Sequence, residues 1–391
     1  MHPTTQALHT PYALPDAYGA LAMPVYHCAS YEFSTAEAMI PAFTGESDLP
    51  DYSRVTNPTV THLEHRVRAL TGARDVVAFS SGMAAISNLF LALAQQSKNI
   101  VTSRHVFGNT YALLQRTLAR FGVETRYADL TDHEQVRSLI DEHTCCLYLE
   151  VLTNPQLEVP HLHALAQIAH AAGVPLVADS TAIPFTHTRL HELGVDIEVL
   201  SSTKYLSGGG TSIGGLLIDY GSIPELDHRL RQELLLNLGA YMTPHAAYMQ
   251  TLGLETLAVR YARQAATAQQ LAEWLEQQPQ VRRVTYAGLP THPQHELARE
   301  QFGHSYGAML TFDLEHQAAC FALLNRLHLF RRATNLFDSR SLAIHPHSTI
   351  FANCSDEERA AMHIDDTTIR LSIGLEEPSD LQADLLQALN P

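Results

Sequence analysis

A single lysine, Lys204, stands between hydroxyl side chains and a glycine run in residues 200–210. The apolar residues before it are typical of a buried strand. Burial disfavours the charged ammonium, and the neutral amine is the form that attacks an aldehyde. Ser201 and Thr203 are suited to hydrogen-bond a phosphate, and the glycines allow close backbone approach to a ligand. The pattern indicates a Schiff-base lysine that holds pyridoxal phosphate (PLP); a surface lysine before a flexible loop is the alternative.

An acid, Asp179, ends a second apolar run at residues 176–179. In an open parallel sheet, ligands bind beyond the carboxyl ends of the strands. An acid there can keep the pyridine nitrogen of PLP protonated, so that the ring accepts electrons. Asp179 could instead cap the following helix. An acid and a lysine at the ends of consecutive predicted strands favour the cofactor site.

A turn of small residues, 80–82, joins a predicted strand at 76–79 to a predicted helix at about 84–94. The N–H groups at a helix N-terminus form an anion site. We therefore expect Ser81, Gly82 and Met83 to contact the phosphate of PLP. The same turn can serve only as a helix cap, so it supports the cofactor site only together with Lys204 and Asp179.

Several segments together resemble the Cys/Met-metabolism PLP enzymes. These segments are YSRVTNPT at 52–59, SSGMAA at 80–85, Asn154-Pro155, Asp179 and STK at 202–204. The family includes cystathionine γ-synthase, cystathionine lyases, methionine γ-lyase and O-acetylhomoserine sulfhydrylase, and the chain most resembles the sulfhydrylase-like members. The resemblance runs from about Pro24 to the C-terminus. It implies PLP fold type I, in which a mostly parallel seven-stranded α/β sheet carries a smaller C-terminal α/β domain.

The resemblance also implies an assembly. Tyr52 and Arg54 are expected to reach the neighbouring subunit's site and bind the PLP phosphate there, with Tyr52 also among the catalytic residues. Arginine suits this role because its fork of donors matches a phosphate; a weak surface ion pair is the alternative for Arg54. The catalytic unit is then at least a dimer, and a homotetramer, a dimer of dimers, is expected.

Substrate contacts follow from the same resemblance. Arg370 matches the arginine that clamps the substrate α-carboxylate. On a strand it must face away from Ile369 and Leu371, toward either a cleft or solvent. Asn335 is expected to bind the substrate carboxylate, and Asn154 the 3-oxygen of PLP or that carboxylate. A turn asparagine before proline is the alternative for Asn154.

Four positions bear on the reaction. Many members have tyrosine at the position of Phe107, where the ring stacks on PLP. Phe107 is expected to keep this stacking but lacks the proton-donating hydroxyl of tyrosine. Asn109 replaces the cysteine typical of methionine γ-lyase. Thr334 stands where cystathionine-handling members usually carry glutamate. Asp51, in contrast, resembles the acidic residue of cystathionine γ-synthase.

These residues predict a PLP-dependent γ-replacement on an O-acylated homoserine, with sulfide or a small thiol as the nucleophile. Within the family, a carbon–sulfur γ-lyase acting on methionine or cystathionine and a cystathionine γ-synthase are the alternatives. A non-catalytic PLP-binding regulatory protein is a more remote one, which the intact Lys204, Asp179 and Arg370 disfavour. The expected partner is a small amino-acid substrate.

Short apolar strands alternate with amphipathic helices and must position these residues. Helices such as 162–172 lie between the strands, which favours a mostly parallel sheet covered on both faces. A long helix at about 251–277 leads into a second module with helices at 317–327 and 379–389. The expected domains are an N-terminal arm (1–57), a PLP-binding domain (58–250) and a C-terminal domain (251–391). Strands are expected at 76–79, 100–102, 124–127, 146–149, 176–178, 197–200 and 215–218, then at 281–286, 309–312 and 368–372.

Composition narrows the classes of partner. The 391 residues can bury a large core, and the net charge of −16 argues against nucleic acid and anionic membranes. The five cysteines are odd in number and lack C-x-x-C spacing, which fits a reducing, cytoplasmic location. No signal peptide or membrane span is visible. The 23 histidines are scattered, so no metal site is expected.

Overall fold

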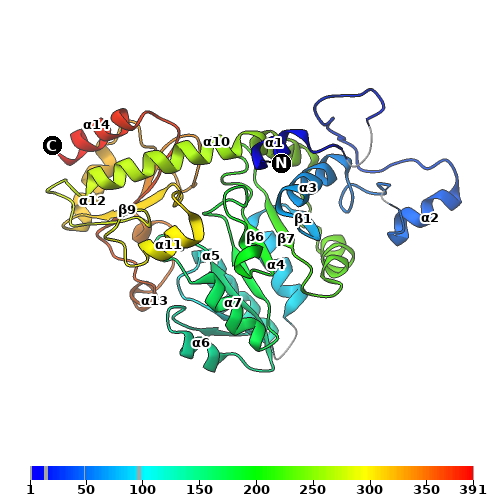
Figure 1. Ribbon diagram of the computed structural model, residues 1–391, viewed down its shortest axis with the longest axis horizontal. Helices are drawn as coiled ribbons and strands as arrows, with labels where there is room; N and C mark the ends of the chain where they lie inside the picture. The colour runs from blue at the N-terminus through cyan, green and yellow to red at the C-terminus, as the bar shows by residue number, and fades with distance from the viewer. Residues whose placement is uncertain (1, 13–15, 48, 95–97, 391) are drawn as a thin grey trace.

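The computed structural model describes residues 2–12, 16–47, 49–94 and 98–390 (Figure 1). Residues 1, 13–15 and 48 of the predicted arm, residues 95–97 of the predicted PLP-binding domain and residue 391 of the predicted C-terminal domain lie outside these ranges. The described chain is built around a seven-stranded sheet and a four-stranded sheet.

The larger sheet has the strand order β1-β7-β6-β5-β4-β2-β3. Only β7 runs antiparallel to its neighbours, β1 and β6, so the predicted mostly parallel seven-stranded sheet is confirmed. Every predicted strand in this region is present. The strands are β1 (Asp75–Phe79), β2 (Asn99–Thr102), β3 (Glu124–Tyr127), β4 (Thr144–Glu150), β5 (Leu176–Asp179), β6 (Ile197–Leu200) and β7 (Gly215–Asp219).

The two faces of this sheet pack against different apolar clusters. In β5, Leu176 and Ala178 belong to one buried cluster and Val177 belongs to the other, because successive strand residues point to opposite faces. The central strands are therefore mostly apolar, as expected for a sheet covered on both sides. The helices of this region are α3 (Pro58–Thr71), α4 (Gly82–Leu93), α5 (Gly108–Ala112), α6 (His133–Leu139), α7 (Leu162–Ala171), α8 (Leu226–His228) and α9 (Leu236–Leu238).

The smaller sheet is antiparallel, with the order β10-β11-β9-β8. The sequence patterns did not predict β10 (Leu342–Ile344), because three apolar residues do not show a strand period. The other strands are β8 (Arg283–Thr285), β9 (Met309–Asp313) and β11 (Thr368–Ser372). The helices are α11 (His295–Phe302), α12 (Gln317–Arg326), α13 (Asp356–Ala361) and α14 (Pro378–Leu389).

A single long helix, α10 (Pro244–Leu275), connects the two sheets along the edge of the molecule (Figure 1). It begins seven residues before the predicted start at 251. Thr243 caps it by accepting a hydrogen bond from the N–H of Ala246, and Pro244 occupies its first turn. Both are sequence signals of a helix start. The predicted boundary at position 250 falls inside α10. The division into three domains stays a prediction.

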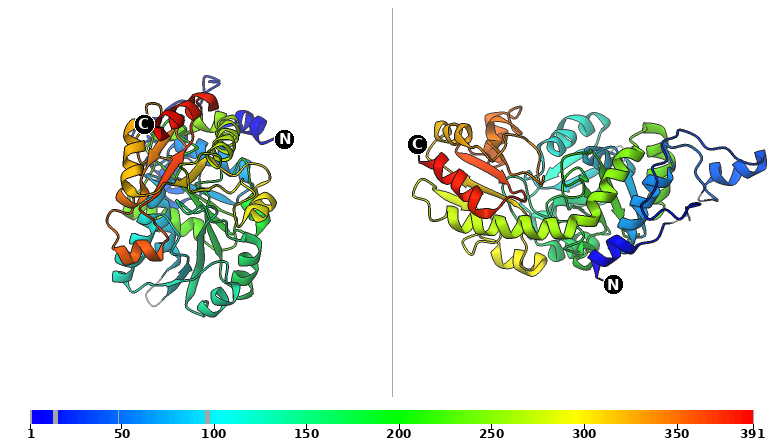
Figure 2. Two further views of the ribbon diagram at one scale, coloured as in Figure 1. Left: turned by 90° about the vertical axis from the view of Figure 1, so that its left-hand side faces the viewer. Right: turned by 90° about the horizontal axis from the view of Figure 1, so that it is seen from above.

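The N-terminal residues form an arm, as Figures 1 and 2 show. Helix α1 (Pro3–His9) packs on α3 and α10, whereas α2 (Ala36–Thr44) projects away from the body and has no buried residue. The expected contact of the arm with a neighbouring subunit stays a prediction. Short 3₁₀ helices lie at Leu118–Phe121, Leu190–Leu193 and Pro346–Ser348, and short π-helices at Leu113–Thr117 and Arg229–Leu235.

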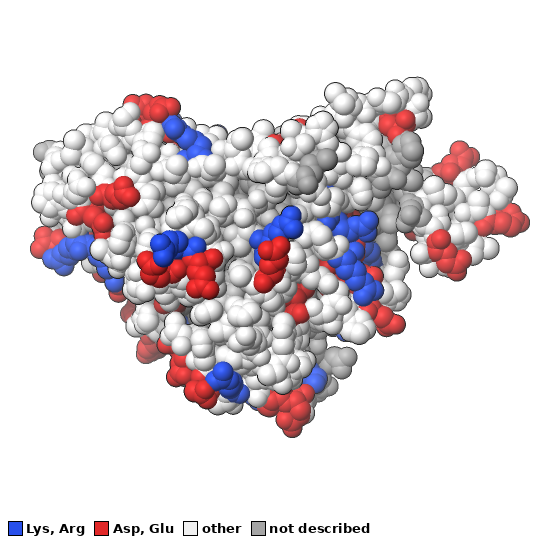
Figure 3. Space-filling model, in the orientation of Figure 1, with Lys and Arg blue, Asp and Glu red and all other residues white. Residues whose placement is uncertain are grey.

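Charge on the visible face is dispersed. Figure 3 shows acidic and basic side chains in small groups separated by wide uncharged areas, and the projecting arm carries acidic groups there. Such a face lacks the continuous basic stripe typical of a nucleic-acid interface. In the part of the chain that the structure describes, no helix combines the length and apolar character needed to cross a membrane.

Candidate active site

A cavity of about 680 Å³ opens where the carboxyl ends of the central strands meet the N-terminus of α4. Ten of the residues that the sequence predicted for the site line it, although they come from distant parts of the chain. Residues Ser81, Gly82, Met83, Phe107, Asn154, Asp179, Ser201, Thr203, Lys204 and Arg370 are brought together here, with Glu150, Thr181, Thr334 and Phe337 beside them.

Lys204 sits in a compact turn directly after β6. Its N–H donates to the carbonyl of Ser201 (3.1 Å), and its Nζ donates to Oδ1 of Asn335 (2.8 Å). Burial, followed by the positive charge of Arg370, lowers the pKa of Lys204 to about 8, against a smaller opposing effect of Asp338. Much more of the amine is therefore neutral near neutral pH than in an ordinary lysine, and the neutral amine is the nucleophile for an aldehyde.

Asp179 is buried at the end of β5. Its Oδ1 accepts from the N–H of Thr181 (2.9 Å), and its Oδ2 accepts from the hydroxyl of Tyr148 (3.4 Å). Burial raises the pKa of Asp179 above its ordinary value. A protonated pyridine nitrogen placed against this carboxylate would favour its ionised form, because an opposite charge stabilises the anion.

A second buried acid, Glu150, lies beside Asp179 in the strand register and was not predicted as a site residue. Its Oε1 accepts a 2.5 Å hydrogen bond from the N–H of Phe107. Burial, and then the charge of Asp179, raises the pKa of Glu150 well above its ordinary value. The sequence did contain a signal for Glu150. This acid follows the apolar run Leu147-Tyr148-Leu149 at the end of its strand, as Asp179 does at the end of β5.

The turn before α4 forms a close-fitting cradle. A Cβ on Gly82 would lie only 2.8 Å from Cβ of Ser201, so only glycine lets the helix approach the end of β6 this closely. Gly82 and Met83 open the helix, where N–H groups have no partner within the helix. The Oγ of Ser81 accepts from the N–H of Ala84 (3.0 Å). These donors suit a phosphate, and with Lys204 and Asp179 they form a set of groups that fits PLP.

Thr203 lines the same cavity, but its hydroxyl is already engaged. It donates to the carbonyl of Gly214 (3.2 Å) and accepts from the N–H of that residue (3.0 Å). The hydrogen bond therefore joins the lysine turn to the start of β7. Direct contact of Thr203 with a phosphate stays a prediction.

Arg370 projects from β11 into the cavity. Ile369 and Leu371 lie in the apolar core on the opposite face of the strand, so the solvent-facing alternative is wrong. One Nη donates to Oδ1 of Asn154 (2.9 Å), and the other contacts the carbonyl of Thr334 (3.4 Å). Burial lowers the pKa of Arg370 to about 9.

Arg370 also has unused binding capacity. Its buried Nε has no hydrogen-bond partner, and no ion pair to it exists among the described residues. A buried guanidinium without a carboxylate carries a large desolvation cost. A substrate carboxylate would supply the missing partner.

Phe337 packs against the turn that carries Lys204. Its ring stacks on Tyr205 with a centroid distance of 4.0 Å and an interplanar angle of 5°. Its backbone lies in the left-handed region (φ 55°), and its N–H donates to Oγ of Ser372 (2.7 Å). Phe337 thus helps to hold the neighbour of Lys204 in place, a contact between distant segments that no local pattern encodes.

Tyr52 and Arg54 lie outside the cavity of their own chain. Arg54 donates to the carbonyl of Leu236, and its guanidinium carbon lies 5.4 Å from the centroid of the Tyr52 ring. Tyr52 is 43% exposed. Both residues are therefore free of the site of their own chain, and their binding to the PLP phosphate of a neighbouring subunit stays a prediction.

Comparison with known proteins gives consistent results. A profile described as Cys/Met metabolism PLP-dependent enzyme matches residues 4–390. L-methionine gamma-lyase of Pseudomonas putida is 38% identical over 387 residues, covering 98% of this chain and 96% of the relative. O-succinylhomoserine sulfhydrylase of Pseudomonas aeruginosa is 37% identical over 367 residues, covering 93% of this chain and 90% of the relative.

A solved structure matches the whole fold. It is a Campylobacter jejuni protein named for O-acetylhomoserine (thiol)-lyase activity, with N′-pyridoxyl-lysine-5′-monophosphate at one position of its chain. It superimposes with a TM-score of 0.97 at 30% identity and covers 100% of both chains. PLP fold type I is thereby confirmed.

Proposed function

The chain belongs to the Cys/Met metabolism PLP-dependent enzymes, and on this premise we propose that it catalyses γ-replacement on an O-acylated homoserine, with sulfide or a small thiol as the nucleophile. It is a PLP-dependent enzyme of sulfur amino-acid metabolism. The observation that carries the finer proposal is Phe107 on the cavity wall, in a cavity that no tyrosine or histidine lines among the described residues.

A phenylalanine at position 107 carries no hydroxyl that could protonate a leaving group as it departs. The carboxylate of an acyl ester departs as a weak base and needs little protonation, whereas the thiolate of methionine or cystathionine is a stronger base and gains from an acid. Phe107 keeps an apolar ring at the cavity wall and donates no proton. An activated ester is therefore the substrate class that this cavity serves best.

Each residue has a distinct part in the proposal. Bound PLP supplies an electron sink for the carbanions formed next to the substrate nitrogen. Lys204, with its lowered pKa, would take up and return protons at Cα and Cβ of the substrate. Arg370, oriented by the Oδ1 of Asn154, binds the substrate carboxylate. Asp179 keeps the ring nitrogen protonated.

Phosphate binding falls to the cradle at the start of α4. Ser81, Gly82 and Met83 offer donors there from this chain, with Ser201 beside them. Tyr52 and Arg54 of a neighbouring subunit would add a hydroxyl and a guanidinium. In this scheme the catalytic unit is a dimer, two of which form the proposed tetramer.

A carbon–sulfur γ-lyase is the second candidate, because similar relatives include L-methionine gamma-lyases. Asn109 lines the cavity and carries no thiol for the chemistry of such a lyase. The two reactions separate in one assay. O-acetylhomoserine, O-succinylhomoserine, methionine and cystathionine are each offered with and without sulfide.

Homocysteine and 2-oxobutyrate are then both measured. Sulfide-dependent homocysteine from an ester, in excess over 2-oxobutyrate, is the expected result. Faster release of 2-oxobutyrate from methionine than of homocysteine from either ester would overturn the proposal and favour the lyase.

A further inference from the structure

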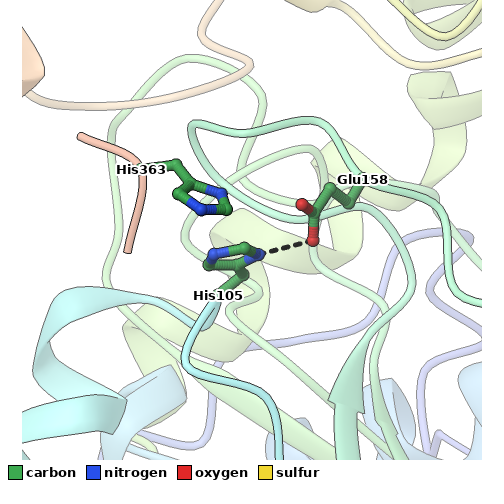
Figure 4. A group of neighbouring side chains, drawn as sticks. All are labelled: His105, Glu158 and His363. Atoms are coloured by element: carbon green, nitrogen blue, oxygen red, sulfur yellow. Dashed lines mark hydrogen bonds and ion pairs between the residues drawn. The ribbon is translucent and has the colours of Figure 1, made fainter. Parts of the chain in front are cut away.

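Three side chains outside the PLP site form a compact cluster with the chemistry of a metal ligand set. They are His105, Glu158 and His363 (Figure 4). One ligand atom from each lies within 4.8 Å of the others. Ligand atoms around a tetrahedral zinc ion are roughly 3.3 Å apart, so small side-chain movements would close the set. No short motif reveals it, because the three ligands come from separate segments.

Local backbone structure positions each of the three residues. His105 follows β2, and its N–H donates to Oγ of Ser103 (2.9 Å). The N–H of Glu158 donates to Oγ1 of Thr153 (2.9 Å), and the carbonyl of Glu158 accepts from the N–H of Thr153 (3.1 Å). His363 lies two residues after the end of α13, in the left-handed conformation, with φ 53°. That conformation is uncommon for a residue with a side chain.

The donor atoms already interact with each other. Nδ1 of His105 and Oε2 of Glu158 are 2.5 Å apart, and the rings of His105 and His363 have centroids 4.9 Å apart. Figure 4 shows His105 between the other two side chains. A metal ion would replace the proton shared between Nδ1 and Oε2. Asp129 adds negative charge nearby, since Thr131 and then both histidines lower its pKa.

Solvent reaches the cluster from one side. Glu158 and His363 line a cavity of about 950 Å³ that is separate from the PLP site. His105 is largely buried, with 12% of its side chain exposed. The arrangement therefore offers three ligands on one side and room for water or a small anion on the other, as in an open zinc site.

We propose that His105, Glu158 and His363 bind one divalent transition-metal ion of the zinc type. Two imidazoles and one carboxylate suit Zn²⁺, Co²⁺ or Ni²⁺, whereas Mg²⁺ and Ca²⁺ prefer oxygen ligands. The ion ties the large sheet, through His105 and Glu158, to the segment that carries His363. The chain that leads to His363 passes Thr349 and Ile350, which line the PLP cavity.

Zinc binding to the PLP-loaded enzyme is measured by equilibrium dialysis with metal analysis, and Co²⁺ binding by its visible absorption. The variants are Glu158→Gln and His363→Asn; asparagine tolerates the left-handed backbone at 363. His143→Gln is the matched control, because His143 is an exposed histidine 3.8 Å from a carboxylate of Glu142.

One zinc ion per chain is expected in the parent and in His143→Gln, and none at this site in the two cluster variants. Zinc at a hundredfold excess over Kd should raise the Tm of the parent by about 2–3 °C and leave that of Glu158→Gln unchanged. The Tm values of metal-free variants verify that they fold. Equal stoichiometry in all four proteins, or no binding at millimolar zinc, would show that the cluster is only a hydrogen-bonded ion pair.

Discussion

Lys204 Nζ donates a 2.8 Å hydrogen bond to Oδ1 of Asn335, across 131 residues of chain. The contact links the turn after β6 to the segment that precedes β10, so the amine of the larger sheet is held by a side chain from the smaller part of the protein. Among the described residues, Asn335 is the one hydrogen-bond partner of the Lys204 amine, and Arg370 is its main electrostatic neighbour.

Replacing Lys204 tests the assigned nucleophile. We expect Lys204→Ala to lose at least about 1,000-fold in turnover, because proton transfers to and from Cα lose their base. The Tm should not fall, since the change removes a buried amine rather than an apolar contact. The sequence contains only two lysines, so Lys98→Ala is the natural control and should remain active.

Borohydride reduction of the PLP-loaded enzyme followed by peptide mapping gives an independent check. The pyridoxyl label should appear on Lys204 and not on the half-buried Lys98. Label confined to Lys98, or full activity of Lys204→Ala, would refute the assignment.

Loading of the apoenzyme with PLP should depend on pH. The pKa of Lys204 is lowered to about 8, so the reactive neutral amine increases as pH rises through that value. The loading rate, followed by absorbance of the lysine-bound cofactor, should rise over the same range. Arg370→Gln removes a positive neighbour, which makes the ammonium less unfavourable and raises the pKa of Lys204. The midpoint should then move to higher pH, and an unchanged midpoint would exclude the proposed coupling.

Activity should depend on residues shared between subunits. Lys204→Ala and Arg54→Ala are each expected to be inactive. After the two are unfolded and refolded together, hybrid oligomers should contain intact sites, up to roughly a quarter of the total for random dimers. Activity that stays at the level of the separately refolded variants would show that Arg54 serves no neighbouring site.

Phe107→Tyr should be tolerated, because it preserves the ring and adds one hydroxyl at the cavity wall. The added acid should help a thiolate leave more than it helps an acyl carboxylate. The ratio of kcat/KM for methionine to that for O-acetylhomoserine should therefore increase. Phe107→Leu is the control that removes the ring without adding an acid. A ratio unaltered by tyrosine would remove the role given to Phe107.

Glu150 and Asp179 should respond differently to amide substitution. Burial raises the pKa of Glu150 well above its ordinary value, so Gln closely mimics its neutral form and keeps an acceptor for the N–H of Phe107. We expect Glu150→Gln to retain activity within about tenfold and Asp179→Asn to lose about 100-fold or more, because the ring nitrogen loses its anionic partner.

Glu150→Ala should cost about 1–3 kcal/mol in the free energy of unfolding, since it leaves the partly buried N–H of Phe107 without an acceptor. Chemical denaturation of the parent and of Glu150→Ala measures this difference in the free energy of unfolding. Equal losses of activity in Glu150→Gln and Asp179→Asn would show instead that the ionised form of Glu150 takes part in the reaction.

The sequence by itself determined the strand and helix pattern around Lys204 and Asp179. Apolar runs that end in a functional residue have a local period and a local boundary, which is why β5 and β6 could be predicted closely. The start of α10 was misplaced although Thr243 and Pro244 signalled it, and β10 was too short to show a period.

Only the tertiary structure decided which face of a strand lines the cavity and which side chains from distant segments come into contact. Alternation places Arg370 opposite Ile369 and Leu371, but the choice between cavity and solvent depended on how the small sheet packs. Glu150 became a site residue because strand register sets it beside Asp179. The His105–Glu158–His363 cluster joins three loops that share no sequence signal. Contacts of this kind depend on the packing of whole elements, which the local period of a sequence does not encode.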